Sequence, residues 1–391
     1  MGRAPTTLLN GASSFQLDES YSGSSKYRTS AVAADGRIFA APADASRVLV
    51  FDPSRNASYQ LDESYSGSRK YITSAVAADG RIFAAPYDGA SRVLVIDPSR
   101  NASYRLDESY SGSRKYITSA VAADGRIFAA PYDGASRVLV IDPSRNVSYQ
   151  LDESYSGSRK YVTSALADDG RIFAAPYSAS RVLVIDPSRN ASYQLDESYS
   201  GYRKYSKASA VAADGRIFAA PYDGASRVLV IDPSRNTSYQ LDESYSGSHK
   251  YSTSAVAADG RIFAAPYNGS SRVLVIDPAR NASYQLDESY SGSRKYVTSA
   301  LAADGRIFAA PYDGASRVLV IDPSRNVSYQ LDESYSGSHK YITSAVAADG
   351  RIFAAPYDGA SRVLVIYPGS YRYKTPAPTI TFTPTLVSTD D

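Results

Sequence analysis

The sequence has no cysteine and no tryptophan, a single methionine and two histidines. Without cysteine, neither a disulfide framework nor a thiolate metal site is available, which fits a reducing compartment or a domain stable without cross-links. No apolar run approaches the roughly 20 residues of a membrane-spanning helix. The first residues also lack a charged segment followed by an apolar stretch. We therefore expect neither a membrane span nor a signal peptide in the chain as printed.

An excess of charge of one sign is also missing. The chain carries 42 Lys and Arg against 40 Asp and Glu. Nucleic-acid-binding domains normally show a basic face or stripe. Nucleic acid is therefore not an expected partner.

What the sequence does contain is one segment repeated along almost its whole length. The glycine of an Asp-Gly-Arg tripeptide marks each copy, with a first spacing of 44 residues and spacings of 45 thereafter. Such a unit cannot bury its apolar faces alone and needs neighbours, so eight copies predict a solenoid or a propeller. The marker glycines are Gly36, Gly80, Gly125, Gly170, Gly215, Gly260, Gly305 and Gly350.

Four strand-length runs are visible within one repeat, at 74–78, 81–87, 92–97 and 103–109. Four short strands per repeat of this length are typical of a propeller blade. Residues 93–96 of the third run are all apolar, as expected of a strand covered on both faces. The fourth alternates between apolar and polar residues, which indicates a partly solvated outer strand.

Turn residues separate these runs. Asp79-Gly80 predicts a type I′ hairpin turn, in which both central residues have positive φ. In the turn Asp97-Pro98-Ser99-Arg100-Asn101, proline fixes φ and Asn101 suits the left-handed region.

The repeat resembles the blades of YVTN-type and NHL-like β-propellers. Ala77 to Phe83 and Val93 to Pro98 carry the resemblance, which covers about residues 15–367. It implies an all-β fold, which we expect to be a single eight-bladed propeller of four-stranded antiparallel blades. It transfers no catalytic residue. WD40 and kelch repeats match less well, because tryptophan and the kelch double glycine are missing.

The ends of the chain predict how the ring closes. Residues 15–20 form an outer-strand sequence with no blade before it, and the last copy stops near Pro368 without an outer strand. We expect the N-terminal strand to complete the eighth blade. An open superhelical array is the alternative, and it is disfavoured because neither end has a polar capping repeat.

Three segments follow from this organisation. Residues 1–13 are an N-terminal lead, 14–368 form the propeller, and 369–391 are a tail rich in threonine and proline. The tail reads as an extended linker. Alternation at 379–383 leaves open a strand that adds to a sheet edge elsewhere.

Residues for catalysis are hard to find. His249 and His339 occupy a position held by arginine in other repeats, so a substituted surface arginine is the simplest interpretation. The recurrent aspartates stand where turns already favour them, and no calcium-loop motif is present. We therefore predict no catalytic residue, no metal site and no cofactor.

The repeated tyrosines suggest binding. Tyr65, Arg69, Tyr87, Asp88 and their equivalents predict one repeated binding face, unless the tyrosines simply wedge neighbouring blades. The leading hypothesis is a non-enzymatic structural or interaction protein with protein partners or self-association. The alternative is a multivalent lectin-like module that binds glycans. An enzyme of the quinone-dehydrogenase or lactonase kind is disfavoured, because no tryptophan docking or metal-binding set is seen.

Asparagine sequons recur at one turn of the repeat. Asparagine followed by a small residue is also ordinary turn chemistry, yet a ring of acceptor sites predicts N-glycosylation if the protein is secreted. On this ground we favour an extracellular or cell-surface location. The sequons are at Asn56, Asn101, Asn146, Asn190, Asn236, Asn281 and Asn326, with one more in a different turn at Asn268.

Overall fold

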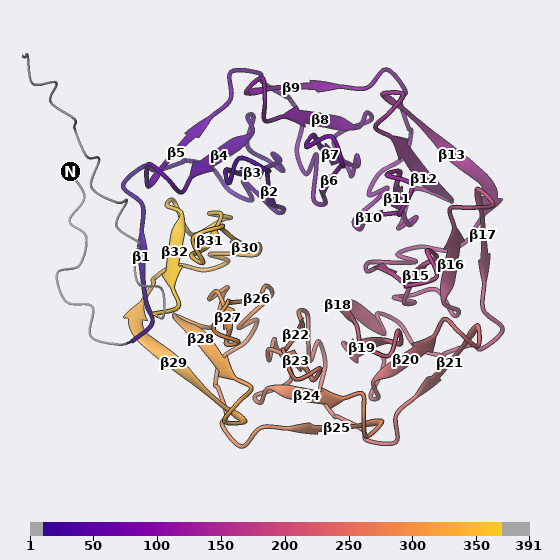
Figure 1. The fold of residues 1–391 in the computed structure, drawn as a ribbon, viewed down its shortest axis with the longest axis vertical. Helices are drawn as coiled ribbons and strands as arrows, with labels where there is room; N and C mark the ends of the chain where they lie inside the picture. Colours follow the sequence, from indigo (N-terminus) through magenta and orange to yellow (C-terminus); the bar gives the residue numbers. More distant parts are fainter. Residues whose placement is uncertain (1–10, 370–391) are drawn as a thin grey trace, which may run out of the picture.

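A computed structural model describes residues 11–369. Within this range there are thirty-two strands and no helix, so no helix there could cross a membrane. The strands form eight four-stranded sheets arranged in a ring (Figure 1). The prediction of an eight-bladed all-β propeller is confirmed. The lead before residue 11 and the tail after residue 369, including the strand expected at 379–383, lie outside the described residues.

Each blade consists of four antiparallel strands taken in chain order from the ring centre outward. The innermost strands of blades 1 to 8 are β2 (Ala31–Val32), β6 (Ala75–Val76), β10 (Ala120–Val121), β14 (Ala165–Leu166), β18 (Tyr205–Val211), β22 (Ala255–Val256), β26 (Ala300–Leu301) and β30 (Ala345–Val346). The second strands are β3 (Ile38–Ala40), β7 (Ile82–Ala84), β11 (Ile127–Ala129), β15 (Ile172–Ala174), β19 (Ile217–Pro221), β23 (Ile262–Ala264), β27 (Ile307–Ala309) and β31 (Ile352–Ala354).

The two outer layers complete the blades. The third strands are β4 (Leu49–Asp52), β8 (Leu94–Asp97), β12 (Arg137–Asp142), β16 (Leu183–Asp186), β20 (Leu229–Asp232), β24 (Leu274–Asp277), β28 (Arg317–Asp322) and β32 (Leu364–Tyr367). The outermost strands are β5 (Ala57–Gln60), β9 (Ala102–Arg105), β13 (Val147–Ser154), β17 (Ala191–Gln194), β21 (Thr237–Gln240), β25 (Ala282–Gln285), β29 (Val327–Ser334) and, in blade 8, β1 (Ser13–Gln16).

Most strands are shorter than the runs that predicted them. The second strand of blade 2 ends at Ala84, and Pro86, which has no N–H, is joined to Tyr71 by an isolated bridge. The hairpin before it also differs from the prediction. Only Gly80 has positive φ, at 84°, and its N–H bonds to the carbonyl of Ala77 at 3.0 Å. The connection is therefore a three-residue loop with a left-handed glycine rather than a type I′ turn.

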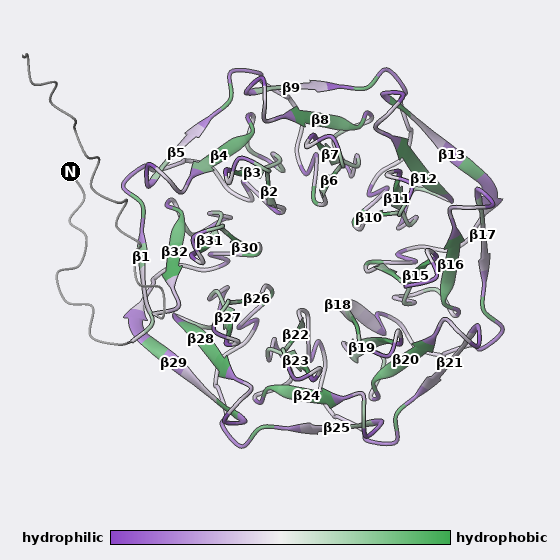
Figure 2. Cartoon of the chain, viewed as in Figure 1, coloured by the Kyte–Doolittle hydropathy of each residue, from purple (hydrophilic) through white to green (hydrophobic). Residues whose placement is uncertain are grey.

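The hydrophobic core lies between the blades. In β8, Leu94 and Ile96 pack against blade 1, whereas Val95 packs against blade 3. All three side chains are fully buried, which is why this run is apolar on both faces. The third strands accordingly show as hydrophobic segments around the ring, and the outermost strands as more polar ones (Figure 2).

The N-terminal strand closes the ring as predicted. β1 pairs with β32, with Phe15 opposite Val365, and so supplies the fourth strand of blade 8. Leu17, 2% exposed, joins a core cluster that contains Phe51 of blade 1 and Phe353 of blade 8. The first described residues are thereby tied to the last.

A polar clamp links each blade to the next on the face that carries the Asp-Gly hairpins. In blade 2, Arg81 is paired with Asp79 and donates to the side-chain oxygen of Asn146 at 2.8 Å and to the carbonyl of Pro143 at 2.6 Å, both in blade 3. Arg351 of blade 8 makes the equivalent bond to Asn56 of blade 1. The clamp continues in this way around the ring, and between blades 7 and 8 its bond runs from Arg306 to the carbonyl of Pro368.

Candidate functional site

An arc of seven tyrosines runs around the ring axis on the opposite face. They come from seven successive blades, each just after the second strand, and neighbouring ring centroids are 6.1 to 6.4 Å apart. Since each tyrosine touches the next, together they form most of a collar at the mouth of the central channel. We call this set the tyrosine collar: Tyr87, Tyr132, Tyr177, Tyr222, Tyr267, Tyr312 and Tyr357.

The collar has one gap, in blade 1, where Ala43 replaces tyrosine. The guanidinium of Arg28 lies beside this gap, with its Cζ 5.0 Å from the centre of the Tyr357 ring. Arg28 also donates a hydrogen bond to the Tyr357 hydroxyl, and its charge acts on Tyr87 on the other side. A cation thus takes the place of the missing aromatic ring.

Arg28 occupies the same repeat position as Lys207. Both residues stand eight positions before the marker glycine of their repeat, Gly36 and Gly215. In blade 5 the extra residue before this position shifts the pairing of β18 with β19 between Tyr205 and Ser209. We call this the channel position. Its other occupants are uncharged: Ile72, Ile117, Val162, Ser252, Val297 and Ile342.

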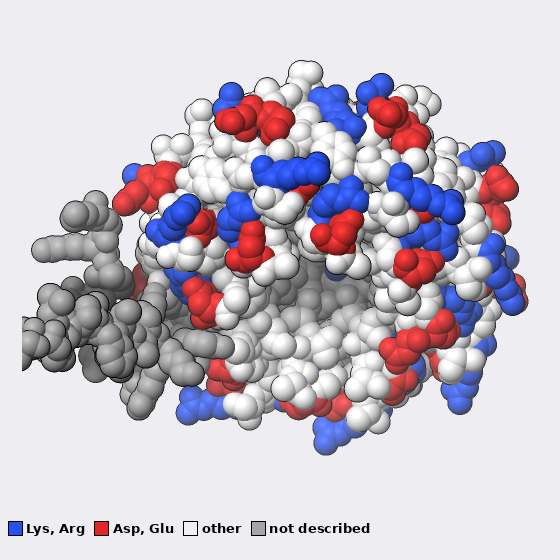
Figure 3. Space-filling model, turned by 45° about the horizontal axis from the view of Figure 1, so that its top comes forward, with Lys and Arg blue, Asp and Glu red and all other residues white. Residues whose placement is uncertain are grey.

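The two cations meet in one cavity. It has a volume of about 120 Å³ and is lined by residues from blades 1, 5, 6, 7 and 8. Blades 1 and 5 face each other across the ring (Figure 1). In space-filling view this centre is a hollow surrounded by acidic and basic side chains (Figure 3). The lining residues are Arg28, Lys207, Ser252, Tyr267, Val297, Tyr312, Ile342 and Tyr357.

Neither cation has a carboxylate partner among residues 11–369. Arg28 bonds only to the Tyr357 hydroxyl, its Nε is buried without a hydrogen bond, and Lys207 makes no hydrogen bond or ion pair within that range. Lys207 is open to water inside the channel but surrounded by protein. Burial, and next the charge of Arg28, lower the pKa of Lys207 to about 8. Like charges without a counter-ion favour a bound anion.

The two histidines lie at the rim of the same mouth. His249 places its Nε2 3.5 Å from Asp223, and its ring meets that of Tyr222 edge-on at 4.9 Å. Burial, opposed by Asp223, lowers the pKa of His249. His339 repeats these contacts with Asp313 and Tyr312. Both histidines have positive φ, as do the arginines at the same repeat position. The backbone there therefore has the same conformation with either residue.

The residues of the predicted repeated binding face lie in different surroundings in the structure. Tyr65 is 5% exposed and donates to Ser103 of blade 2 at 2.7 Å, so it wedges two blades. Arg69 and Asp88 form a surface ion pair at 3.7 Å, and Tyr87 belongs to the collar. A repeated site at these residues stays a prediction.

The sequon asparagines take part in the clamp. All seven of the repeated set have positive φ, as expected for Asn101. The side-chain oxygen of Asn101 accepts bonds from Arg37 at 2.7 Å and from the Tyr59 hydroxyl at 2.9 Å. Asn101 is nevertheless solvent-exposed. Glycosylation at these residues and at Asn268 stays a prediction.

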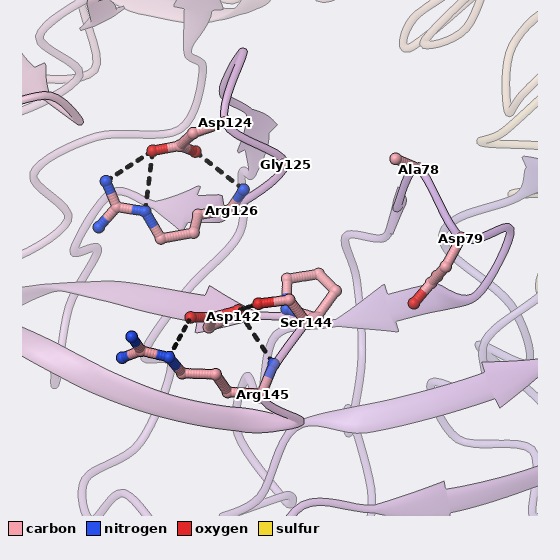
Figure 4. A pocket seen from close by; sticks show the side chains of 9 residues that line it. Ala78, Asp79, Asp124, Gly125, Arg126, Asp142, Ser144 and Arg145 are labelled. Atoms are coloured by element: carbon pink, nitrogen blue, oxygen red, sulfur yellow. Dashed lines mark hydrogen bonds and ion pairs between the residues drawn. The ribbon is translucent and has the colours of Figure 1, made fainter.

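A larger groove lies on the hairpin face but contains only paired charges. Its volume is about 390 Å³, and it is lined between blades 2 and 3 by hairpin and turn residues (Figure 4). Asp124 is paired with Arg126, while Asp142 accepts bonds from Ser144 and Arg145 within its own turn. No three acidic or histidine side chains gather as a metal site anywhere in residues 11–369.

Comparison with known proteins places the fold. No family model and no curated protein matches the chain. A solved streptogramin B lyase has a TM-score of 0.59 at 12% identity, covering 91% of this chain and 97% of that one. Virginiamycin B lyase from Staphylococcus aureus has a TM-score of 0.57 at 10% identity, and the match covers 91% of this chain and 98% of the lyase. The periplasmic gluconolactonase of Pseudomonas aeruginosa has a TM-score of 0.56 at 17% identity, and the match covers 76% of this chain and 94% of the gluconolactonase.

These neighbours confirm the resemblance to YVTN-type and NHL-like propellers at the level of the fold. They also correct the leading functional hypothesis. A purely structural, non-enzymatic role is wrong as an inference from this architecture, because the same fold carries a lyase and a gluconolactonase. At these identities the similarity shows the fold alone.

The sequence analysis singled out neither Arg28 nor Lys207, and it did not predict that they line the same cavity. The repeats are so alike that a departure at a single position is easily overlooked. Alignment on the marker glycine of each repeat puts both cations in one column of otherwise uncharged residues. That column was the available signal.

Proposed function

We propose that the protein binds a small anionic molecule, a carboxylate of metabolite size, at the mouth of its central channel. The observation that carries this proposal is the convergence of Arg28 and Lys207 in one cavity without a carboxylate partner among the described residues. A bound anion would relieve the repulsion between the two cations and accept their free N–H groups.

The surroundings suit such a ligand. Tyr267, Tyr312 and Tyr357 line the cavity with amphipathic side chains, while Val297 and Ile342 offer apolar contact. A few convergent polar groups in a partly apolar concavity are typical of small-molecule sites. The cavity favours a compact ligand over a polymer.

Ligand-induced thermal stabilisation tests the proposal. Acetate, pyruvate and phosphate should raise the Tm of the full-length protein at low ionic strength, whereas neutral acetamide should not. Arg28→Ile should reduce the shift strongly and still fold, because isoleucine stands at Ile72 and Ile117 in sister blades. Arg55→Ala removes an equal charge from the turn between β4 and β5, where the side chain is 80% exposed, and should leave the shift intact. Equal shifts in both variants would contradict the proposal.

A further inference from the structure

Lys207 differs from every other lysine in the described part of the chain. Eight lysines share one position in the connections between blades; they are 1 or 2% exposed, and each donates to a glycine carbonyl at 2.6 to 2.8 Å. Lys207 alone is open to water, with no hydrogen bond in residues 11–369. The eight are Lys26, Lys70, Lys115, Lys160, Lys204, Lys250, Lys295 and Lys340.

We propose that Lys207 is a reactive amine that forms an imine with the carbonyl group of a small 2-oxo acid, whose carboxylate is held by Arg28. This inference rests on the anion site proposed above and names its ligand class. A guanidinium binds a carboxylate in a fixed orientation, through two parallel hydrogen bonds. The carbonyl next to that carboxylate would then face the opposite wall, from which Lys207 approaches.

The chemistry needs only groups that are present. The lone pair of neutral Nζ attacks the carbonyl carbon, the carbonyl oxygen takes up the two protons that Nζ loses and leaves as water, and a carbon–nitrogen double bond replaces the carbon–oxygen one. An amine that is surrounded by protein and next to another cation keeps a larger neutral fraction, which activates it as a nucleophile. Its pKa of about 8 agrees with this.

Tyrosine hydroxyls can assist the loss of water. Tyr312 lines the cavity, and burial raises its pKa, so its hydroxyl stays protonated and able to donate. Ser252 adds a second hydroxyl on the same wall. Neither residue is needed to form the new bond.

Lys204 is an internal control three residues away. Burial also lowers its pKa to about 8, yet its Nζ is bound to the carbonyl of Gly201 at 2.8 Å and its side chain is 1% exposed. A lowered pKa alone therefore predicts equal reactivity for both lysines. The geometry predicts reaction at Lys207 only.

Reductive trapping tests the proposal. The full-length protein is incubated with pyruvate and cyanoborohydride, and its peptides are mapped by mass spectrometry. We expect one reduced adduct on Lys207, none on Lys204, and only background labelling of Lys374 and the α-amino group. Lys207→Arg keeps the charge and should still bind pyruvate, but it should give no adduct at this position.

A second probe separates carboxylate recognition from general reactivity. Arg28→Ile should slow trapping of pyruvate about tenfold, as expected for a lost charge-assisted contact. Trapping of propanal, which has no carboxylate, should slow much less, because Arg28→Ile then acts only through the loss of a neighbouring cation that lowers the pKa of Lys207. Labelling of Lys207 no faster than Lys374, or equal slowing with both probes, would overturn the inference. A pyruvate-induced Tm shift without an adduct would refute the imine and keep the anion site; absence of both would refute both.

Discussion

Arg351 of the last blade donates from Nη1 to the side-chain oxygen of Asn56 in the first blade, at 3.0 Å and across 295 positions of sequence. The same guanidinium is paired with Asp349 at 2.6 Å and is 6% exposed. The arginine clamp that joins successive blades therefore also joins the two ends of the ring.

Loss of this clamp should destabilise the fold. Arg351→Ala leaves the Asn56 oxygen and the Pro53 carbonyl without their donor, and we expect a loss of about 2–3 kcal/mol in the free energy of unfolding. Arg100→Ala is the control, because that side chain is 80% exposed in a surface pair and should cost less than about 1 kcal/mol. Urea unfolding of both variants measures the difference. Equal losses would show that the clamp adds nothing beyond a surface pair.

The N-terminal strand should contribute as much as an internal one. Leu17 and Leu106 are each 2% exposed and hold equivalent positions after the outermost strands of blades 8 and 2. Both leucine-to-alanine variants should lose about 2–4 kcal/mol. A neutral Leu17→Ala beside a costly Leu106→Ala would mean that β1 does not complete blade 8 in solution.

Two glycines of nearly equal φ allow backbone strain to be separated from a steric clash. Gly112 has φ of 94° and Gly157 of 92°. A Cβ added at Gly112 would lie 2.5 Å from the carbonyl oxygen of Gly134, whereas a Cβ added at Gly157 would have no atom within 4 Å. Gly157→Ala should cost about 1–2 kcal/mol, the price of the left-handed conformation. Gly112→Ala should cost clearly more. Indistinguishable unfolding midpoints would refute the close approach.

Stability should pass through a maximum in alkaline solution. Burial lowers the pKa of Lys204 and Lys295 to about 8, so between this value and the ordinary 10.4 the unfolded chain binds more protons and stability rises with pH. Burial raises the pKa of Tyr177 to about 12 and that of Tyr116 further. Above pH 10 the unfolded tyrosines lose protons first, and stability falls. Urea midpoints at pH 7.5, 9.5 and 11 should therefore peak at 9.5; a steady decline would contradict these shifts.

The fold could be predicted from the sequence because the same local pattern recurs in all eight repeats. The fully apolar run Val93–Ile96 predicted burial on both faces, and the unpaired outer-strand sequence near Phe15 predicted ring closure. The hairpin at Gly80 was predicted wrongly, because an Asp-Gly pair fits both a type I′ turn and a three-residue loop with a left-handed glycine. Turn type depends on the register of the paired strands, which the dipeptide does not contain.

The candidate site could be read only in part. The sequence predicted one binding face that contains both Tyr65 and Tyr87, because sequence spacing does not show that Tyr87 belongs to the tyrosine collar whereas Tyr65 lies between two blades. Arg28 and Lys207 are 179 positions apart, and only ring closure brings their blades face to face. Departures from a repeat are therefore best compared at one repeat position across all blades.

Calorimetric titration of pyruvate into four forms of the full-length protein tests the central claim most directly. The forms are wild type, Arg28→Ile, Lys207→Ala and the Arg55→Ala control, all at low ionic strength. We predict that wild type and Arg55→Ala bind with the same Kd and that each channel variant binds about tenfold more weakly. Equal affinity in all four forms would show that the two channel cations do not form a ligand site.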